Sequence, residues 1–167
     1  MVASEGGVTW TGWLVAAVIE RAGKFLLIEE RAEGRLVLNQ PAGHLDEGET
    51  LMAAVVRETL EETGWHFSPE ALLGIYRWRH PTKSTTYLRF AFIGSVSRHD
   101  SGRTLDRGIT RTLWLTPDEI HAARNRHRTP QVELCVKDYI SGQRYSLELL
   151  KELAGLNARP SSRRARS

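Results

Sequence analysis

Three glutamates share one face of a helix that the sequence predicts over residues 50–63. Glu58, Glu61 and Glu62 follow the spacing i, i+3 and i+4, so their side chains point the same way. Like charges at this spacing repel one another, and a sequence that needed only a helix would not stack them. A hard divalent cation, bound through oxygen atoms, turns the repulsion into ligation. The spacing therefore predicts a site for such a cation.

A glycine-led acidic loop, Gly43–Glu49, precedes the helix. Loop and helix together follow the pattern Gly-x5-Glu-x7-Arg-Glu-U-x-Glu-Glu-x-Gly-U, in which U is an apolar residue. The fixed positions are Gly43, Glu49, Arg57, Glu58, Glu61, Glu62 and Gly64. The U positions carry Thr59 and Trp65, which are tolerable but uncommon. This segment resembles the Nudix box, the motif of enzymes that hydrolyse a nucleoside diphosphate linked to another moiety.

The resemblance extends beyond the box, over residues 8–153. The segments Asn39–Leu45, Leu88–Phe90 and Ser141–Tyr145 are similar to the NudJ-type Nudix phosphatases. That resemblance implies an α/β fold, a Nudix-type α/β/α sandwich with a mixed central sheet. It also implies hydrolysis of nucleoside tri- and diphosphates with release of orthophosphate, and action on pyrimidine pyrophosphates of thiamine biosynthesis.

The resemblance also assigns roles around the cation. It implies Mg2+ as the cofactor, with Mn2+ as a substitute, because both suit oxygen ligands and phosphate. The expected ligands are Glu58, Glu61, Glu62 and the backbone carbonyl of Gly43. Arg57 is expected to orient glutamates through a salt bridge, with Glu49 as its natural partner. The alternative for Arg57 is a surface arginine on a charged helix.

Two questions stay open at this point. The general base is Glu62 or Glu61, acting on a cation-bound water, or a group on a distant loop within residues 99–106. Many relatives carry a further acidic ligand just before a tryptophan that corresponds to Trp114 here. Residues 110–112 contain no acid, so that ligand is either absent or replaced by Asp106.

Candidate substrate contacts lie outside the box. Trp78 offers a face on which a base can stack, and Lys83 offers a cation for phosphate. Arg89, inside an otherwise apolar strand, is the leading candidate for a buried phosphate-binding cation. The alternative is an edge residue whose guanidinium reaches solvent. Asn39 and Gln40 adjoin the acidic loop and are candidates for contacts to phosphate or ribose.

Composition indicates a globular protein of one domain, with 41% hydrophobic and 26% charged residues in a chain of 167. We expect a single Nudix domain over residues 1–157 and a basic, disordered tail over residues 158–167. The tail carries four arginines, so removing it changes the net charge from +3 to −1. We interpret it as a solubilising tail; contact with nucleic acid or a membrane surface is the alternative.

The compartment is predicted from absences in the sequence. No apolar run is long enough to span a membrane, and residues 1–7 lack the basic and apolar regions of a secretory signal. Cys135 is the single cysteine and lies among apolar residues, so we interpret it as a small core residue rather than a nucleophile. A cytoplasmic protein is expected. The sequence does not predict an oligomeric state.

The elements that must position these residues follow from hydrophobic periodicity. Strands are predicted over residues 8–20, 24–30, 35–38, 72–78, 86–96 and 110–115. Helices are predicted over residues 50–63, 117–123, 132–140 and 147–153. In the first helix Thr50 is the expected N-cap and Gly64 the expected stop, and the pairs Leu51–Val55 and Met52–Val56 form its core-facing stripe. This order of elements predicts a mixed sheet covered by helices.

These observations raise three enzymatic functions and one binding function. The leading hypothesis is a Mg2+-dependent Nudix hydrolase acting on nucleoside tri- and diphosphates. The alternatives are a nucleotide hydrolase that releases pyrophosphate and an RNA 5′-pyrophosphohydrolase, which the arginine-rich tail motivates. A non-catalytic nucleotide-binding protein is disfavoured because every carboxylate of the box is present. The expected partner is a nucleotide or small pyrophosphate, with no membrane and no nucleic acid as the principal partner.

Overall fold

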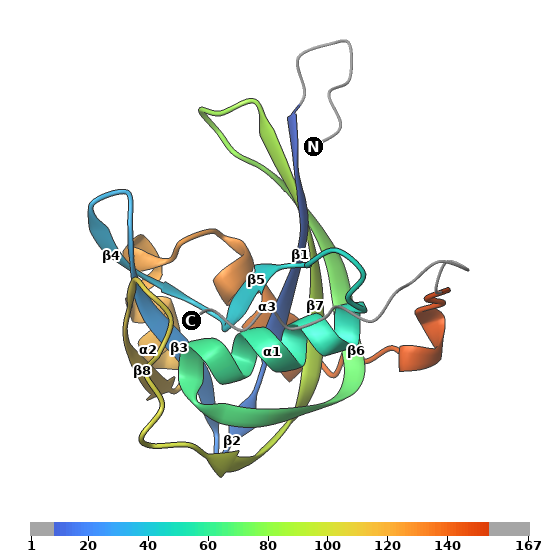
Figure 1. Ribbon diagram of the computed structural model, residues 1–167. Helices are drawn as coiled ribbons and strands as arrows, with labels where there is room; N and C mark the ends of the chain where they lie inside the picture. Colours follow the sequence, from blue (N-terminus) through green and yellow to red (C-terminus); the bar gives the residue numbers. More distant parts are fainter. Residues whose placement is uncertain (1–8, 154–167) are drawn as a thin grey trace, which may run out of the picture.

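A computed structural model describes residues 9–153, except for the side chains of residues 9–11. Its strands form two four-stranded sheets (Figure 1). The first has the order β5-β1-β7-β6, with bounds Ala42–His44, Thr9–Val18, Thr85–His99 and Trp65–Arg79. The second has the order β2-β3-β4, with β8 on β3 and bounds Glu20–Arg21, Lys24–Ala32, Arg35–Asn39 and Ile109–Leu115.

The first sheet is mixed, as the sequence predicts. Strand β1 pairs with β7 in parallel, whereas β5 and β6 pair with their neighbours antiparallel. Strands β6 and β7 are longer than expected, chiefly because they continue to pair at the end away from their hairpin, where Phe67 pairs with Val96 and Trp65 with His99. The expected strand over residues 8–20 divides into β1 and the short β2, which turns onto β3 in the second sheet.

The helices are α1 (Leu51–Thr63), α2 (Pro117–Ala122) and α3 (Gln131–Ile140). Thr50 caps α1 by accepting a hydrogen bond from Ala53 N, and Gly64 ends it in the left-handed region at φ 73°. The prediction of a helix over residues 147–153 is wrong. Only Leu147–Leu149 forms a short 3-10 turn. Leu150 and Leu153 continue the apolar spacing, but Leu149 and Leu153 are exposed, so no helical face is buried there.

The core lies on both faces of the first sheet. Helix α1 packs on the face that displays Phe90 and Phe92, and α3 packs on the opposite face with Ala91 and Ile93. Figure 1 shows α1 crossing the sheet on one side and α3 behind it. The predicted α/β sandwich is therefore confirmed.

One part of the predicted stripe on α1 is wrong. Leu51 and Val55 are buried, but Met52 is 37% exposed. The buried stripe continues instead through Ala54, Glu58, Thr59 and Glu62. Two carboxylates of the box thus lie on the core-facing side of the helix, and this placement determines their electrostatics.

Candidate active site

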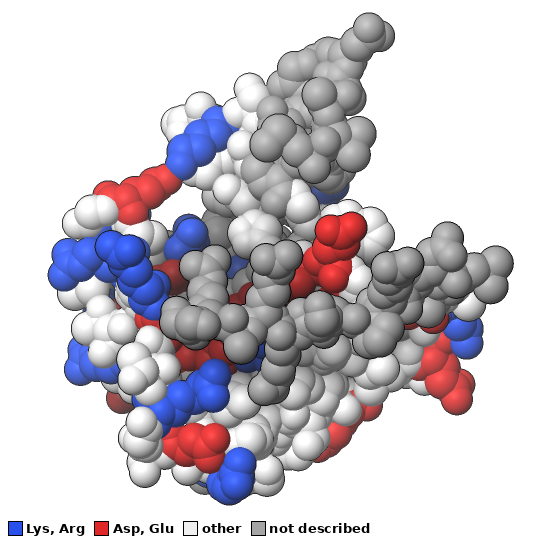
Figure 2. All heavy atoms as spheres, in the orientation of Figure 1, with Lys and Arg blue, Asp and Glu red and all other residues white. Residues whose placement is uncertain are grey.

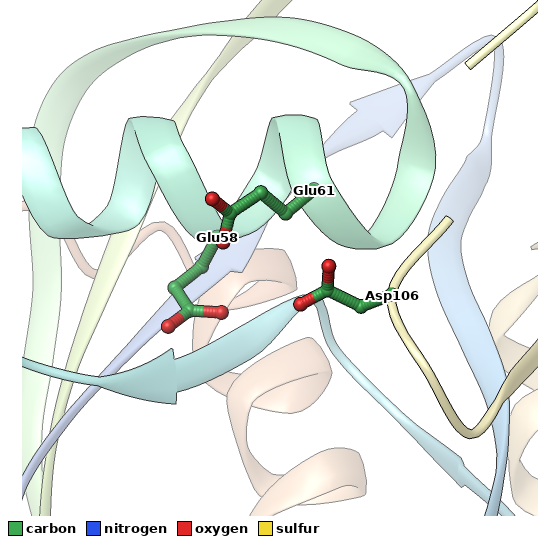
Figure 3. A group of neighbouring side chains, drawn as sticks. All are labelled: Glu58, Glu61 and Asp106. Carbon is green, nitrogen blue, oxygen red and sulfur yellow. The ribbon is translucent and has the colours of Figure 1, made fainter. Parts of the chain in front are cut away.

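Three carboxylates from two separate segments converge beside α1 (Figure 3). Glu58 and Glu61 come from the helix, and Asp106 comes from the connection between β7 and β8. Each offers an oxygen atom, and these atoms lie within 4.8 Å of one another. Asp106 is held in place by its backbone, because its N–H donates to the carbonyl of Glu61 at 3.0 Å. Asp106 therefore lies close to the two glutamates of the box, as the second of the two alternatives requires.

The donor set fits a hard divalent cation. It consists of oxygen atoms alone, as such ions prefer. Gly43 lies directly against it: a Cβ atom at this position would come within 2.0 Å of the Glu58 carboxyl carbon. Only glycine allows β5 to approach Glu58 this closely, which is the physical reason for glycine at the head of the motif.

Glu62 lies apart from this convergence. Its Oε2 accepts a hydrogen bond from Ala42 N at 2.8 Å, at the start of β5. Burial, together with the like charges of Glu58, Glu30 and Asp106, raises the pKa of Glu62 to about 9, and the hydrogen bond from Ala42 N offsets part of this rise. The structure thus brings together three expected or suspected ligands and places Glu62 against the backbone of β5.

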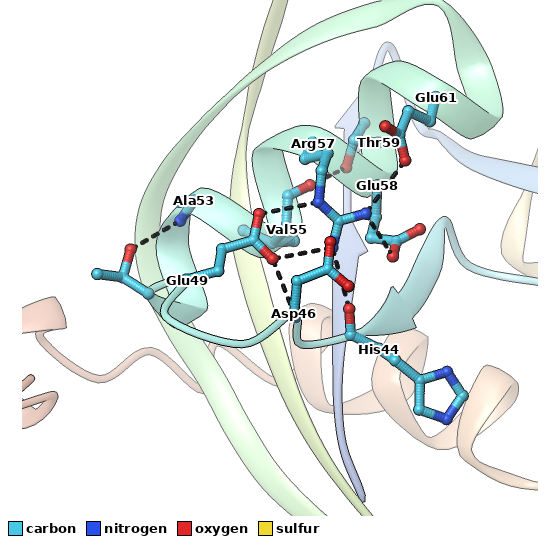
Figure 4. Close-up of polar contacts among 10 residues, drawn as sticks. His44, Asp46, Glu49, Ala53, Val55, Arg57, Glu58, Thr59 and Glu61 are labelled. Atoms are coloured by element: carbon cyan, nitrogen blue, oxygen red, sulfur yellow. Dashed lines mark hydrogen bonds and ion pairs between the residues drawn. The ribbon is translucent and has the colours of Figure 1, made fainter. Parts of the chain in front are cut away.

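Arg57 holds the carboxylates around it in fixed positions (Figure 4). Its Nε donates to Glu49 Oε1 at 2.8 Å, and its Nη1 donates to Glu58 Oε1 at 2.8 Å and to Glu61 Oε2 at 3.1 Å. Nη2 donates to Glu49 Oε2 at 2.9 Å and to the carbonyl of His44 at 3.0 Å. The side chain therefore ties the helix to the acidic loop, which excludes a solvated surface arginine.

The pKa values of Glu49 and Glu58 are shifted in opposite directions. Hydrogen bonds from Arg57 lower the pKa of Glu49 below its usual range. Burial raises the pKa of Glu58, although Arg57 partly offsets this effect. One arginine thus balances only part of the negative charge gathered here, and the remainder favours a bound cation.

A pocket of about 460 Å³ adjoins the acidic loop. Trp78 and Tyr87 form one wall, with their rings stacked at 5.7 Å and inclined by 21°. The complete lining comprises Leu14, Glu30, Ala32, Glu33, Arg35, Val37, Ala42, Gly43, His44, Trp78, His80, Lys83, Tyr87, Arg89, Arg128, Thr129 and Gln131. Its size suits a nucleotide or a similar small molecule.

Arg89 lies in the wall of this pocket and is only 2% exposed. Its Nη1 donates to Gln40 Oε1 at 3.1 Å and its Nη2 donates to Asn39 Oδ1 at 3.2 Å. Burial lowers the pKa of Arg89. The alternative of a solvent-reaching arginine is excluded. Asn39 and Gln40 do not line the pocket; they support the arginine that does.

Lys83 lies at the mouth of the pocket and forms an ion pair with Glu33, from the turn between β3 and β4. Glu30, Tyr87 and Arg128 line the pocket and were not predicted from the sequence. Tyr87 has a recognisable signal, since it lies two residues before Arg89 and must share its face of β7. Glu30 and Arg128 have none, because they meet only through the packing of the second sheet.

Lys and Arg side chains gather over the side of the molecule formed by β3, β4 and β8 (Figure 2). Several of them pair with acids of β3: Arg111 and Arg126 with Glu29, and Arg128 with Glu30. These contacts join β3 to β8 and to the segment before α3. The arginine-rich residues 158–167 lie outside the described residues.

Comparison with known proteins decides the family. The NUDIX domain model matches residues 10–134. Phosphatase NudJ of Escherichia coli (strain K12) is 40% identical over 136 residues, covering 81% of this chain and 88% of that protein. The chain belongs to the Nudix hydrolase family. It is therefore an enzyme, related to a phosphatase, with an acidic cluster that can hold a divalent metal ion.

Solved structures agree with this assignment. A NUDIX hydrolase from Nitrosomonas europaea is 50% identical, covers 85% of this chain and 97% of its own, and superposes with a TM-score of 0.83. A MutT NUDIX hydrolase from Burkholderia pseudomallei shares the fold at 21% identity and a TM-score of 0.65, covering 76% of this chain and 96% of its own. Within residues 9–153, no helix of this Nudix hydrolase is long and apolar enough to cross a membrane.

Proposed function

We propose that this Nudix hydrolase cleaves phosphoanhydride bonds of nucleoside tri- and diphosphates with Mg2+, or Mn2+ in its place, and releases orthophosphate. The observation that carries the proposal is the convergence of Glu58, Glu61 and Asp106 beside a nucleotide-sized pocket. The similarity to Phosphatase NudJ supports orthophosphate as the product. The same site would accept pyrimidine pyrophosphates that are precursors of thiamine.

Bound Mg2+ would offset phosphate charge and acidify a coordinated water. Glu58, Glu61 and Asp106 would hold it, together with the carbonyl of Gly43. Arg57, itself held by Glu49, is a positioning residue that fixes Glu58 and Glu61.

Glu62 is the proposed general base. Its carboxyl group is buried, and its pKa in the metal-free protein is raised to about 9. The positive charge of a cation bound beside Glu58 would lower this pKa toward neutrality, where the ionised carboxylate can accept a proton. The hydrogen bond from Ala42 N fixes one of its oxygens and leaves the other to accept a proton. Glu61, which Arg57 also holds, is the alternative base.

The pocket would hold the remainder of the substrate. Trp78 offers the stacking surface, and Arg89 and Lys83 offer positive charge. Asn39 and Gln40 contribute by orienting Arg89. We further propose a cytoplasmic enzyme with a single catalytic domain over residues 1–157 and a solubilising tail over residues 158–167.

Product analysis tests this proposal. The purified protein with Mg2+ receives nucleoside triphosphates, nucleoside diphosphates and dinucleotides, and free phosphate is measured with and without added pyrophosphatase. Orthophosphate from both tri- and diphosphates without pyrophosphatase is the expected result. Phosphate that appears only after pyrophosphatase would establish a pyrophosphate-releasing enzyme. No product from any of these, with cleavage of 5′-triphosphorylated RNA, would replace the proposal with the RNA alternative.

The variant Glu62→Gln tests the proposed base. It keeps the acceptor for Ala42 N, so we expect the fold to remain and kcat to fall by about a hundredfold to ten-thousandfold. Glu70→Gln, on the exposed side of β6, is the matched control and should leave kcat unchanged. Equal activity of the two variants would remove Glu62 from the mechanism.

A further inference from the structure

Arg89 is a buried cation without a buried acid. Its two hydrogen-bond partners, Asn39 and Gln40, are neutral amides. Its Nε has no hydrogen-bond partner among residues 9–153, and the guanidinium lies beside the thiol of Cys135, which is only a weak acceptor. Buried guanidinium groups are normally paired, because leaving one unpaired in a protein interior is costly. A partner for Arg89 is therefore expected from outside the described chain.

The side-chain amides of Asn39 and Gln40 are held in their orientation by further hydrogen bonds. Gln40 Nε2 donates to the carbonyl of Val132 at 2.8 Å, and Asn39 Nδ2 donates to Glu30 Oε1 at 3.4 Å. Both side chains are thereby fixed with their oxygens toward the guanidinium. They hold Arg89 at a set place in the wall of the pocket. Each terminal nitrogen gives one N–H to an amide oxygen, and its second N–H has no hydrogen-bond partner among residues 9–153.

A second unpartnered polar atom lies at the same end of the pocket. The hydroxyl oxygen of Thr129 is buried and has no hydrogen-bond partner in the described part of the chain. Gln131, 5% exposed, lines the pocket next to it, at the start of α3. The guanidinium and the hydroxyl together offer hydrogen-bond donors, to which an acceptor-bearing group of a ligand is complementary. Gln131 is fixed beside them, because its Nε2 donates to the carbonyl of Tyr76 at 3.3 Å.

Strand register fixes the distance between this end and the acidic loop. Leu14 of β1 pairs with His44 on one side and with Arg89 on the other. Arg89 is thus two strands away from β5, roughly 10 Å across the sheet. If the phosphates lie beside Gly43, that distance is spanned by a sugar and a ring, and the far edge of the ring meets Arg89.

The pocket wall suits a planar ring at that place. Tyr87 and Arg89 share one face of β7, roughly 7 Å apart, and Trp78 stacks on Tyr87. A ring packed against this aromatic wall would present its edge to the guanidinium at hydrogen-bonding distance. Arginine only donates hydrogen bonds, so it favours a ring edge with an oxo group, which accepts them, over an edge with an amino group, which also donates.

We infer that the end of the pocket formed by Arg89, Thr129 and Gln131 is a specificity subsite for a planar ring whose far edge carries a carbonyl oxygen. This inference rests on the proposed function, because the phosphates of that substrate fix the direction of the ring. Among pyrimidine nucleotides it predicts a preference for uracil, with an oxo group at position 4, over cytosine, with an amino group there.

Binding in the absence of metal tests the subsite without any hydrolysis. Titration calorimetry with UMP and CMP, in EDTA, should give a dissociation constant about tenfold lower for UMP. Arg89→Gln should abolish the difference, and Arg89→Lys should reduce it, since a single ammonium cannot replace the guanidinium fork. Arg98→Gln, an exposed position on the same strand, is the matched control and should keep the full preference.

Equal affinities of the wild-type protein for UMP and CMP would overturn the inference, and this comparison needs no variant to fold. A preference that survives in Arg89→Gln, with a thermal unfolding curve like that of wild type, would also overturn it. A parallel assay of UDP and CDP hydrolysis with Mg2+ distinguishes failure of the proposed function from failure of the subsite. Hydrolysis of both without any difference in binding leaves the proposed function intact and removes only the subsite.

Discussion

The acidic face of α1 and the Arg89 end of the pocket present the same physical problem with opposite charge. On α1, Glu58 and Glu62 are buried near like charges, and one arginine offsets only part of them. At the other end Arg89 is buried among neutral groups. Both regions hold a charge that the described residues offset only in part. Each is therefore suited to a ligand of the opposite sign: a cation at α1 and an electron-rich group at Arg89.

The two regions differ in how they are assembled. The acidic face is encoded in one continuous segment, residues 43–65, with a single contribution from Asp106. The Arg89 end draws on β4, β7 and the segment before α3, which are far apart in the sequence. The chemistry is thus local, whereas recognition of the substrate is distributed over the fold.

Apart from loss of the proposed base Glu62, Gly43→Ala is expected to have the largest effect on activity, and this effect should be confined to the acidic face. The new methyl group would collide with the Glu58 carboxylate, which must move away from Glu61 and Asp106. We expect kcat/KM to fall by about a hundredfold and the Mg2+ concentration for half-maximal activity to rise. Gly102→Ala, which meets nothing within 4 Å, is the control. A normal Mg2+ requirement in Gly43→Ala would show that Glu58 need not contact β5.

Glu62→Gln is expected to stabilise the metal-free protein at alkaline pH. The pKa of Glu62 is raised from 4.5 to about 9 by folding, so the folded state binds the proton more tightly than the unfolded state. Its contribution to stability is present below pH 4.5 and is lost as the pH rises toward 9. Glutamine stays neutral throughout, so in EDTA the variant should exceed wild type at pH 9 by at least about 1 kcal/mol.

Urea unfolding at pH 4.5 and pH 9, in EDTA, measures this difference. The two proteins should have similar stability at the lower pH and diverge at the higher one. A variant that is less stable than wild type at both would mean that the hydrogen bond from Ala42 N outweighs the cost of the buried charge. The buried charge of Glu62 would then not be a net cost to the fold, and the acidic face would not resemble the Arg89 end in this respect.

Lys83→Met should have the smallest effect and bears on the mouth of the pocket. Lys83 pairs with Glu33 between two exposed turns, and solvent screens such a pair. We expect no measurable change in thermal stability and a modest rise in KM with kcat unchanged. A large fall in kcat would place Lys83 at the reacting phosphate rather than at the entrance.

The fold and the acidic site could be predicted from the sequence more fully than the pocket could. Thr50 and Gly64 bound α1 as expected, because capping residues act locally. The ion pair between Arg57 and Glu49 follows from the motif and is present. Met52 was assigned to the wrong face because its hydrophobicity fits either side of a helix, and only packing against β5 and β6 distinguishes them.

The pocket could not be assembled from sequence patterns. Arg89 stood out as a cation in an apolar strand, but its partners Asn39 and Gln40 belong to β4 and the turn after it. Their joint role depends on the place where two sheets meet, which no local spacing encodes. Asp106 was partly predictable. The sequence offered it as a replacement for the further acidic ligand, but its contact with Glu61 depends on the backbone hydrogen bond that forms on folding.

The most direct test of the central claim, that α1 and Asp106 together form a cation site, is Mn2+ binding measured by electron paramagnetic resonance without nucleotide. Asp106→Asn should weaken binding about tenfold or more, because it removes one of the three converging carboxylates. Asp100→Asn is the matched control, since Asp100 is in the same connection but pairs with His66 and Arg98. We predict that the control binds Mn2+ like wild type. Equal binding by Asp106→Asn and the control would contradict the account.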